Sequence, residues 1–188
     1  MKSLDASFYT DPVNFAAERE RIFRPAWWLL GPAQSCQKPG EYMCDTVCGW
    51  QVLVVRGKDG VLRGFHNHCR HRGARLLEAG SGSCRVIKCP YHGWGYDTSG
   101  ALIATPGFSE EAGIDRATLG LQPLHVTEWR SMIFICVDPD PQPFSDWVGS
   151  LDAMLDDLPG IDVMEFHGRF DVHGDANWKT YCLSLIHI

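Results

Sequence analysis

Apolar and polar residues follow different patterns in successive parts of the chain, and each pattern predicts a different element. Residues 13–24 mix apolar and charged side chains in a helical pattern, behind Asp11 as a capping residue and Pro12 at the first helical position. From about residue 39 to residue 137 the pattern changes to short β-rich runs separated by turns. Further on, residues 145–158 are predicted to form one helix and residues 166–172 a strand.

One hairpin stands out in the β-rich part. Residues 51–56 and 61–66 flank Asp59-Gly60, a dipeptide that favours tight hairpin turns. Further strands are predicted over residues 86–88, 124–127 and 131–137. Prolines at positions 139, 141 and 143 favour an extended connection, so we expect a domain boundary there. The predicted division is a helical segment 1–35, a β domain 36–137 and a third segment 138–188.

Composition and charge narrow the class of protein. Hydrophobic residues make up 45% of the 188 residues, which predicts a packed core. The net charge of -6 argues against nucleic acid or an anionic membrane as the main partner. No apolar run follows Met1, so no secretory signal is expected, and the strongly apolar residues 132–137 are too few to cross a bilayer. We therefore expect a cytosolic protein in which most of the six cysteines other than Cys69 and Cys89 are buried free thiols.

Two cysteine–histidine pairs carry the candidate chemistry. Cys69 and His71 follow the second strand of the predicted hairpin, and Cys89 and His92 follow the short strand 86–88. Each loop thus offers one thiolate and one imidazole. A Rieske [2Fe–2S] cluster needs this set, because two histidines replace two cysteines on one of its irons. In this interpretation Cys69 and Cys89 bind one iron, and His71 and His92 bind the other.

Zinc is the main alternative for these four residues. Two cysteines and two histidines can hold zinc tetrahedrally, but common zinc fingers pair cysteine with cysteine and histidine with histidine. The glycine-rich stretch after His92, which contains Gly93 and Gly95, has no role in a zinc finger. A zinc-stabilised interaction module, or four unrelated core positions, remain alternatives to the cluster.

The residues around both pairs resemble a known family. Phe-His-Asn-His-Cys-Arg-His-Arg-Gly-Ala at 65–74 and Cys-Pro-Tyr-His-Gly-Trp at 89–94 resemble the Rieske motif of ring-hydroxylating oxygenase α subunits. The resemblance implies a mainly β Rieske domain of stacked antiparallel sheets, with an N-terminal helix and the start of a truncated α+β catalytic domain. The respiratory Rieske proteins carry a serine where Trp94 stands here. We therefore expect a hydroxyl donor to be missing near sulfur and the reduction potential to be lower.

The family resemblance also implies partners and a second metal. Electrons would come from an NAD(P)H-dependent reductase or a ferredoxin, and O₂ would hydroxylate or demethylate a small organic substrate in a homotrimer. A mononuclear Fe(II), held by two histidines and a carboxylate, would lie in the C-terminal domain. Asn177-Trp178-Lys179 matches the start of that iron motif, with some likeness to the branch acting on quaternary ammonium compounds rather than aromatic rings.

The last residues depart from the family pattern. Residues 182–188 contain no acidic residue, and His187 has no second histidine beyond it, so no iron-ligand role is assigned to His187 and no catalytic residue is named. We interpret this stretch as a non-native tail. The expected chain binds the cluster and accepts an electron but does not turn over substrate. A Rieske-type ferredoxin, an electron carrier without catalysis, is the alternative function.

The residues that flank the ligands leave two further predictions. Arg70, Arg72, Arg75 and Lys88 are interpreted either as a docking patch for an acidic electron donor or as ordinary solvated charge. The aromatic residues Trp94 and Tyr96 are predicted to shield the cluster and brace its loop.

Overall fold

The computed structural model describes residues 4–108, 113–158, 160, 163 and 165–185. The chain forms two compact units, one of Pro25–Phe166 and one that combines Met1–Arg24 with His167–Ile188. Within the part of the chain that the structure describes, no helix has the length and apolarity needed to cross a membrane. His187 lies outside the described residues.

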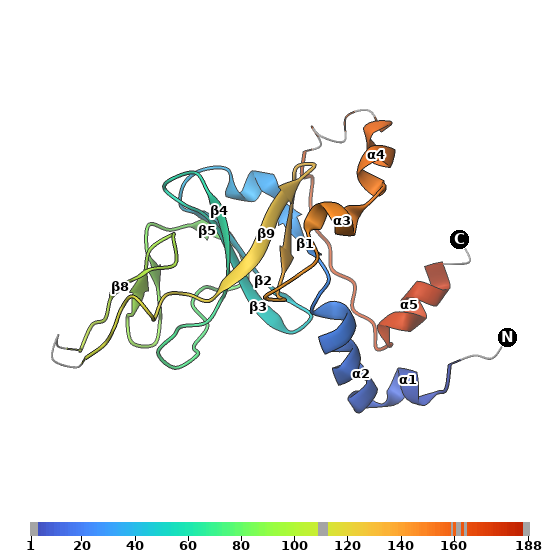
Figure 1. The fold of residues 1–188 in the computed structure, drawn as a ribbon, viewed down its shortest axis with the longest axis horizontal. Helices are drawn as coiled ribbons and strands as arrows, with labels where there is room; N and C mark the ends of the chain where they lie inside the picture. The colour runs from blue at the N-terminus through green and yellow to red at the C-terminus, as the bar shows by residue number, and fades with distance from the viewer. Residues whose placement is uncertain (1–3, 109–112, 159, 161–162, 164, 186–188) are drawn as a thin grey trace. The chain divides into compact units, whose positions relative to one another are not determined.

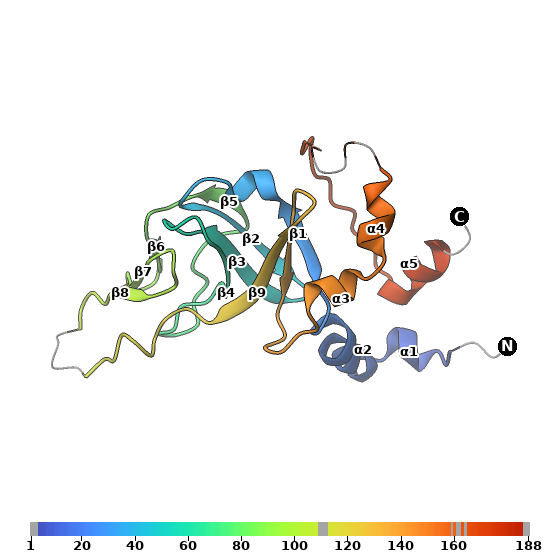
Figure 2. The same ribbon diagram turned by 45° about the horizontal axis from the view of Figure 1, so that its top comes forward.

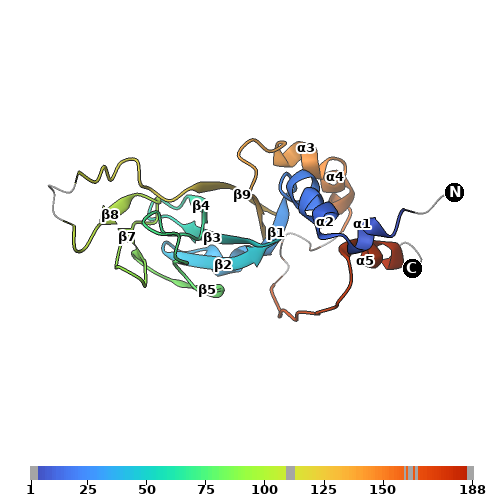
Figure 3. The same ribbon diagram turned by 90° about the horizontal axis from the view of Figure 1, so that it is seen from below.

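The smaller unit is helical. It contains α1 (Ser7–Thr10), α2 (Pro12–Glu18), the π-helical turn η1 (Arg19–Phe23) and, from the far end of the chain, α5 (Trp178–Leu185). The predicted cap is confirmed, because the Asp11 carboxylate accepts a hydrogen bond of 2.8 Å from the Val13 N–H. Figure 3 shows α5 beside α1 and α2.

The predicted strand over residues 166–172 is wrong. This stretch forms no strand in the structure, and the Phe170 and Val172 side chains are 88% and 79% exposed. The alternation of apolar residues is present, but no described strand pairs with it. An extended segment without a pairing partner does not bury its backbone hydrogen-bonding groups in a sheet.

The larger unit is built on a seven-stranded sheet with the order β1-β10-β9-β4-β3-β2-β5. All of its strand pairs are antiparallel, which confirms the expected fold class of mainly antiparallel β with a short N-terminal helix (Figure 1). Its strands are β1 (Trp28–Pro32), β2 (Glu41–Val47), β3 (Trp50–Arg56), β4 (Leu62–His66), β5 (Gly80–Ser83), β9 (Pro123–Trp129) and β10 (Met132–Cys136). A 3-10 turn, η2 (Ala33–Cys36), follows β1.

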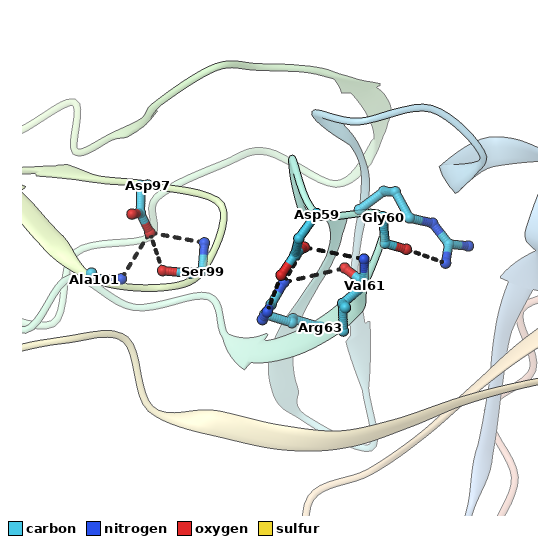
Figure 4. A network of polar contacts seen from close by, with 8 residues as sticks. Asp59, Gly60, Val61, Arg63, Asp97, Ser99 and Ala101 are labelled. Atoms are coloured by element: carbon cyan, nitrogen blue, oxygen red, sulfur yellow. Dashed lines mark hydrogen bonds and ion pairs between the residues drawn. The ribbon is translucent and has the colours of Figure 1, made fainter.

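The predicted hairpin is β3–β4, and its turn is held by one carboxylate. Asp59 accepts hydrogen bonds from the Val61 N–H at 3.1 Å and from both terminal nitrogens of Arg63 (Figure 4). Gly60 has a φ of 79°, a conformation that glycine adopts without strain. The Asp59-Gly60 dipeptide in the sequence therefore predicts the turn and also contains the carboxylate that stabilises it.

A second, three-stranded sheet carries the other half of the candidate site. Its strands are β6 (Ile87–Lys88), β7 (Gly95–Tyr96) and β8 (Leu102–Ala104), in the order β6-β7-β8. Figure 2 shows these short strands gathered away from β2 and β3. Asp97 holds the β7–β8 turn, because its Oδ1 accepts from the Ser99 and Ala101 N–H groups at 2.8 and 3.0 Å (Figure 4).

Strand β3 separates two parts of the core. Val52 and Val54 pack into one cluster with Ile133 and Ile135, whereas Leu53 and Val55 pack into another that contains Cys69 and Cys89. Successive side chains of a strand point to opposite faces, so an unbroken apolar run serves a strand that is covered on both sides. The two cysteines predicted to be ligands are therefore part of a packed core.

The helix predicted over residues 145–158 is interrupted. The structure has α3 (Phe144–Val148) and α4 (Leu151–Asp156), separated at Gly149, whose φ of 54° and ψ of -132° are not helical. Arg130 ties α4 to the β9–β10 turn through Asp152 and Asp156. Both helices and β1 belong to the same compact unit as the β strands between residues 36 and 137.

Candidate metal centre

The two ligand loops share one backbone design. In the first, the Cys69 N–H donates to the Ala74 carbonyl at 2.8 Å, and the Gly73 N–H donates to the Cys69 carbonyl at 2.9 Å. In the second, the Cys89 N–H donates to the Trp94 carbonyl at 2.8 Å, and the Gly93 N–H donates to the Cys89 carbonyl at 3.0 Å. Each loop is thus a six-residue turn that begins at its cysteine and is closed by two backbone hydrogen bonds of that cysteine. The histidine lies inside the turn, between the cysteine and the glycine.

A glycine makes each turn possible. Gly73 and Gly93 have φ values of 70° and 75°, in the left-handed region that other residues enter at a cost. An added Cβ would meet no atom within 4 Å at Gly73, and at Gly93 its nearest neighbour would be Pro106 at 3.5 Å. Backbone conformation, and not lack of space, is therefore what these positions require.

The two thiols lie together in the core. Cys69 is 3% exposed and Cys89 is 2% exposed. Burial raises the pKa of the Cys69 thiol, and the neighbouring Cys89 raises it further, whereas a hydrogen bond with Tyr96 lowers it. Two adjacent thiolates in an apolar core need a positive charge beside them. This pair is accordingly suited to bind a metal ion, which favours the thiolate form.

The two imidazoles lie nearer the surface. The His71 and His92 ring centroids are 4.8 Å apart, with His71 half-buried and His92 exposed. Partial burial lowers the pKa of His71, with further contributions from His92 and Arg72. A lowered pKa favours the neutral ring, which is the form that binds metals.

Aromatic side chains enclose the first histidine. The Trp94 ring stacks on His71 with centroids 4.7 Å apart and planes 9° apart, and Phe108 meets His71 edge-on at 5.5 Å. Trp94 is 3% exposed, and its indole N–H finds no hydrogen-bond acceptor among the described residues. Buried donors normally have an acceptor. A sulfide-containing group bound at this site would supply the acceptor that the Trp94 indole N–H lacks.

Tyr96 connects the second loop to the first. Its hydroxyl oxygen lies 3.3 Å from the Cys69 Sγ and accepts a 3.0 Å hydrogen bond from the Arg70 N–H. Because that N–H already occupies the oxygen as an acceptor, the Tyr96 O–H is available to donate to sulfur. The expectation that a hydroxyl donor is missing near sulfur is therefore wrong for Cys69. Its signal in the sequence is the tyrosine two residues after Trp94, for which the sequence predicts shielding of the cluster and bracing of the loop.

Asn67 is a supporting residue that the sequence did not reveal. Its buried amide donates to the Leu77 carbonyl at 2.7 Å and accepts from the Leu77 N–H at 3.1 Å. These two bonds fasten the segment after the first loop to the end of β4. A polar residue two positions before Cys69, at the end of an apolar strand, was the only available signal.

The four predicted ligands form two pairs, one of buried thiols and one of imidazoles. Among the described residues, no group of three or more His, Cys, Asp or Glu side chains is arranged to hold a single metal ion. A tetrahedral zinc site would need all four ligands around one point. A [2Fe–2S] cluster asks for two protein ligands at each of two irons, and the residues present fit that requirement.

The other candidate residues lie outside the two predicted ligand pairs. Arg70, Arg72, Arg75 and Lys88 are all exposed, and Arg75 pairs with Glu78 at 3.2 Å. His125 Nε2 lies 3.1 Å from the Pro139 carbonyl oxygen, and His167 and His173 are exposed outside any helix or strand. The thiols of Cys36, Cys44 and Cys84 are free, as expected, and burial raises the pKa values of Cys36 and Cys44 to about 12.

Comparison with known proteins places these loops in a family. The Rieske [2Fe-2S] domain family matches residues 26–125. The chain is 32% identical over 179 residues to the carnitine monooxygenase oxygenase subunit of Escherichia coli (strain K12), which covers 95% of this chain and 48% of that protein. It is 37% identical over 201 residues to the biphenyl 2,3-dioxygenase subunit alpha of Rhodococcus jostii (strain RHA1), which covers 98% of this chain and 42% of that protein.

A solved structure agrees with this placement. The quaternary ammonium Rieske monooxygenase CntA, in complex with inhibitor MMV12, matches with a TM-score of 0.88 at 31% identity, over 96% of this chain and 51% of that chain. The chain therefore belongs to the family of Rieske [2Fe–2S] oxygenase α subunits. It spans about half the length of the curated relatives it matches.

Proposed function

We propose that this chain is the electron-accepting part of a terminal oxygenase. In this proposal Cys69 and Cys89 bind one iron of a [2Fe–2S] cluster, and His71 and His92 bind the other. The observation that carries the proposal is the pair of equivalent turns, which brings two buried thiols together and two imidazoles together. When bound, such a cluster supplies reversible one-electron transfer.

The chain's own residues support this role in three ways. The core around Cys69 and Cys89 excludes water from the sulfur end of the site. Stacking on Trp94 keeps the His71 ring in one orientation. The Tyr96 hydroxyl, directed at the Cys69 sulfur, stabilises added negative charge there, which favours the reduced state.

We further propose the complete system from the family membership. An NAD(P)H-dependent reductase or a ferredoxin supplies the electrons, and a mononuclear Fe(II) in the remaining half uses them with O₂. The substrate is a small organic molecule that is hydroxylated or demethylated, in a cytosolic homotrimer. The relatives include a carnitine monooxygenase and a biphenyl dioxygenase, so both quaternary ammonium and aromatic substrates are compatible with the family.

Charged side chains around the histidines support an acidic electron donor. Arg70 and Arg72 flank His71 on the first loop, and Lys88 precedes the second loop; all three are exposed. A positive rim on a chain of net charge -6 favours docking of an acidic protein at this end. The rate of reduction by such a donor is expected to fall with rising ionic strength, and to fall further in Arg72→Glu.

Metal analysis of this chain tests the central proposal. Reconstitution with iron and sulfide is expected to give two irons and two sulfides per chain and, after reduction, the EPR signal of a Rieske cluster. Cys84→Ser is the matched control, since Cys84 is a half-buried cysteine outside both turns. Binding of one zinc ion, with no affinity for iron and sulfide, would contradict the proposal.

A second measurement separates the oxygenase from an electron carrier. The carrier hypothesis is favoured by one observation, namely that all four ligands lie in the single compact unit Pro25–Phe166. As it stands, this chain is expected to accept an electron without forming product from O₂ and substrate. Product formation by these 188 residues would overturn that expectation.

A further inference from the structure

Glu18, at the end of α2, joins the two ends of the chain. Its carboxylate accepts hydrogen bonds from the Trp178 indole N–H at 2.9 Å and from the Lys179 ammonium at 2.6 Å. The Lys179 and Glu18 side chains are only 12% and 13% exposed. An ion pair that is shielded from water and shares a second donor is worth more than an exposed pair.

Aromatic rings complete the surroundings of this ion pair. The Trp178 ring meets Phe23 edge-on with centroids 5.2 Å apart. The Lys179 ammonium lies 5.7 Å from the Tyr9 ring centroid and 5.1 Å from that of Trp178. The cation therefore has one carboxylate and two ring faces beside it.

The helix that starts here depends on these contacts. Asn177 precedes α5, and its side-chain oxygen accepts a 3.1 Å hydrogen bond from the Lys179 N–H, as a helix cap does. None of the residues of α5 is buried, so a packed apolar face does not hold this helix in place. Its first two residues, Trp178 and Lys179, contact the N-terminal helices through the side chains of Glu18, Phe23 and Tyr9.

We propose that Glu18 is a positioning residue, which fixes the start of α5 to the N-terminal helices. In this proposal Asn177 caps α5, and Trp178 and Lys179 attach the helix to Glu18. The functional meaning of this attachment rests on the proposed function, in which residues 177–181 begin the half of the protein that uses the electrons. The N-terminal helices would set the direction in which that half starts.

Hydrogen exchange in matched variants of this chain tests the role of Glu18. Glu18→Gln removes the charge that Lys179 needs, whereas Glu20→Gln removes the same charge from the exposed pair with Arg24. In Glu18→Gln the amides of residues 182–185 are expected to exchange at least about tenfold faster, and trypsin is expected to cut after Lys179 correspondingly faster. In Glu20→Gln both rates are expected to stay within about twofold of the parent.

A second variant distinguishes attachment from a general loss of structure. Trp178→Phe removes one donor and keeps Lys179, so its effect is expected to be smaller than that of Glu18→Gln. In the double variant the two effects are expected to be less than additive, because both changes act on hydrogen bonds of the same Glu18 side chain. Fully additive effects, or equal effects of Glu18→Gln and Glu20→Gln, would overturn the proposal.

The cluster provides an independent readout in the same samples. The optical and EPR signals of the cluster are expected to be unchanged in Glu18→Gln, because all four proposed ligands lie in the other compact unit. A chain that never binds the cluster would contradict the proposed function while leaving the exchange experiment intact. Loss of the cluster signal in Glu18→Gln alone would overturn the inference that Glu18 acts on α5.

Discussion

The two ligand loops have the same backbone and different surroundings. Both close through hydrogen bonds at the cysteine, and both turn at a glycine with positive φ. The first loop, however, is contacted by the end of the second and by the strand β7 that follows it: Trp94 stacks on His71, and Tyr96 bonds to Cys69 and to the Arg70 N–H. His92, on the second loop, is exposed and is covered on one side by its neighbour Tyr91, with ring centroids 3.8 Å apart.

This difference shows that a repeated turn does not make an equivalent site. The backbone design places the ligand atoms, whereas the tuning of those atoms comes from residues outside the turn. Cys69 and His71 are thereby contacted by Tyr96 and Trp94, and His92 is left open to a partner. We expect substitutions in the second loop to act mainly on ligands of the first.

The largest expected effect falls equally on both loops. In the proposed site Cys69→Ser and Cys89→Ser would each remove one of two thiolates from the same iron, so either change is expected to reduce cluster content to below about a tenth of the parent. Iron and sulfide analysis after reconstitution measures this. A cluster retained in one variant and lost in the other would show that the cysteines do not share an iron.

The next largest effect is a loss of stability that differs between the aromatic neighbours of the two histidines. Trp94→Ala removes a buried ring from the core and from His71, and it is expected to cost about 3–5 kcal/mol of unfolding free energy. Tyr91→Ala removes a ring that is 60% exposed and is expected to cost less than about 1 kcal/mol. Urea unfolding of both variants provides the comparison. Similar costs would mean that both histidines are supported alike.

Substitution of the two turn glycines is expected to destabilise both loops by the same amount. Gly73→Ala and Gly93→Ala each force alanine into the left-handed region, at a cost of about 1–2 kcal/mol. Neither added Cβ meets an atom closer than 3.5 Å, so the two costs are expected to agree. Gly168→Ala, where a Cβ would meet nothing within 4 Å and φ is not in the left-handed region, serves as the control. A much larger cost at one turn would reveal a role beyond backbone conformation.

The smallest effect concerns the electron rather than the fold. Tyr96→Phe removes the hydroxyl beside the Cys69 sulfur and is expected to lower the reduction potential. A hydrogen bond worth about 1 kcal/mol corresponds to roughly 40 mV for a one-electron couple. Redox titration of the cluster measures the shift. Tyr91→Phe, on the exposed ring of the second loop, is expected to leave the potential unchanged.

Local signals in the sequence predicted the parts of the fold that short segments determine. Asp11 and Pro12 marked the start of α2, and Asp59-Gly60 marked the β3–β4 turn, because each acts on backbone groups a few residues away. The four proposed ligands were also found locally, since each turn carries its cysteine, histidine and glycine within six residues.

The parts that failed depend on contacts between distant residues. Residues 166–172 have the alternation of a strand, but a strand forms only when another strand pairs with it. The helix predicted over residues 145–158 is interrupted at Gly149, which separates α3 from α4. The hydroxyl of Tyr96 lies beside Cys69 across 27 positions of sequence, a contact that spacing alone does not predict.

Strand β1 pairs with β10, so the segment that connects these two strands begins and ends at neighbouring positions in the sheet. Trp28 lies opposite Ile135, and Pro32 lies opposite Met132, in an antiparallel ladder. Everything that builds the proposed cluster site lies between these two strands. Such a segment is a self-contained insert, with its two ends side by side, and inserts of this kind can be moved between hosts. A short linker joining residues 27 and 137 to a foreign loop is therefore the natural way to graft this redox centre onto another protein.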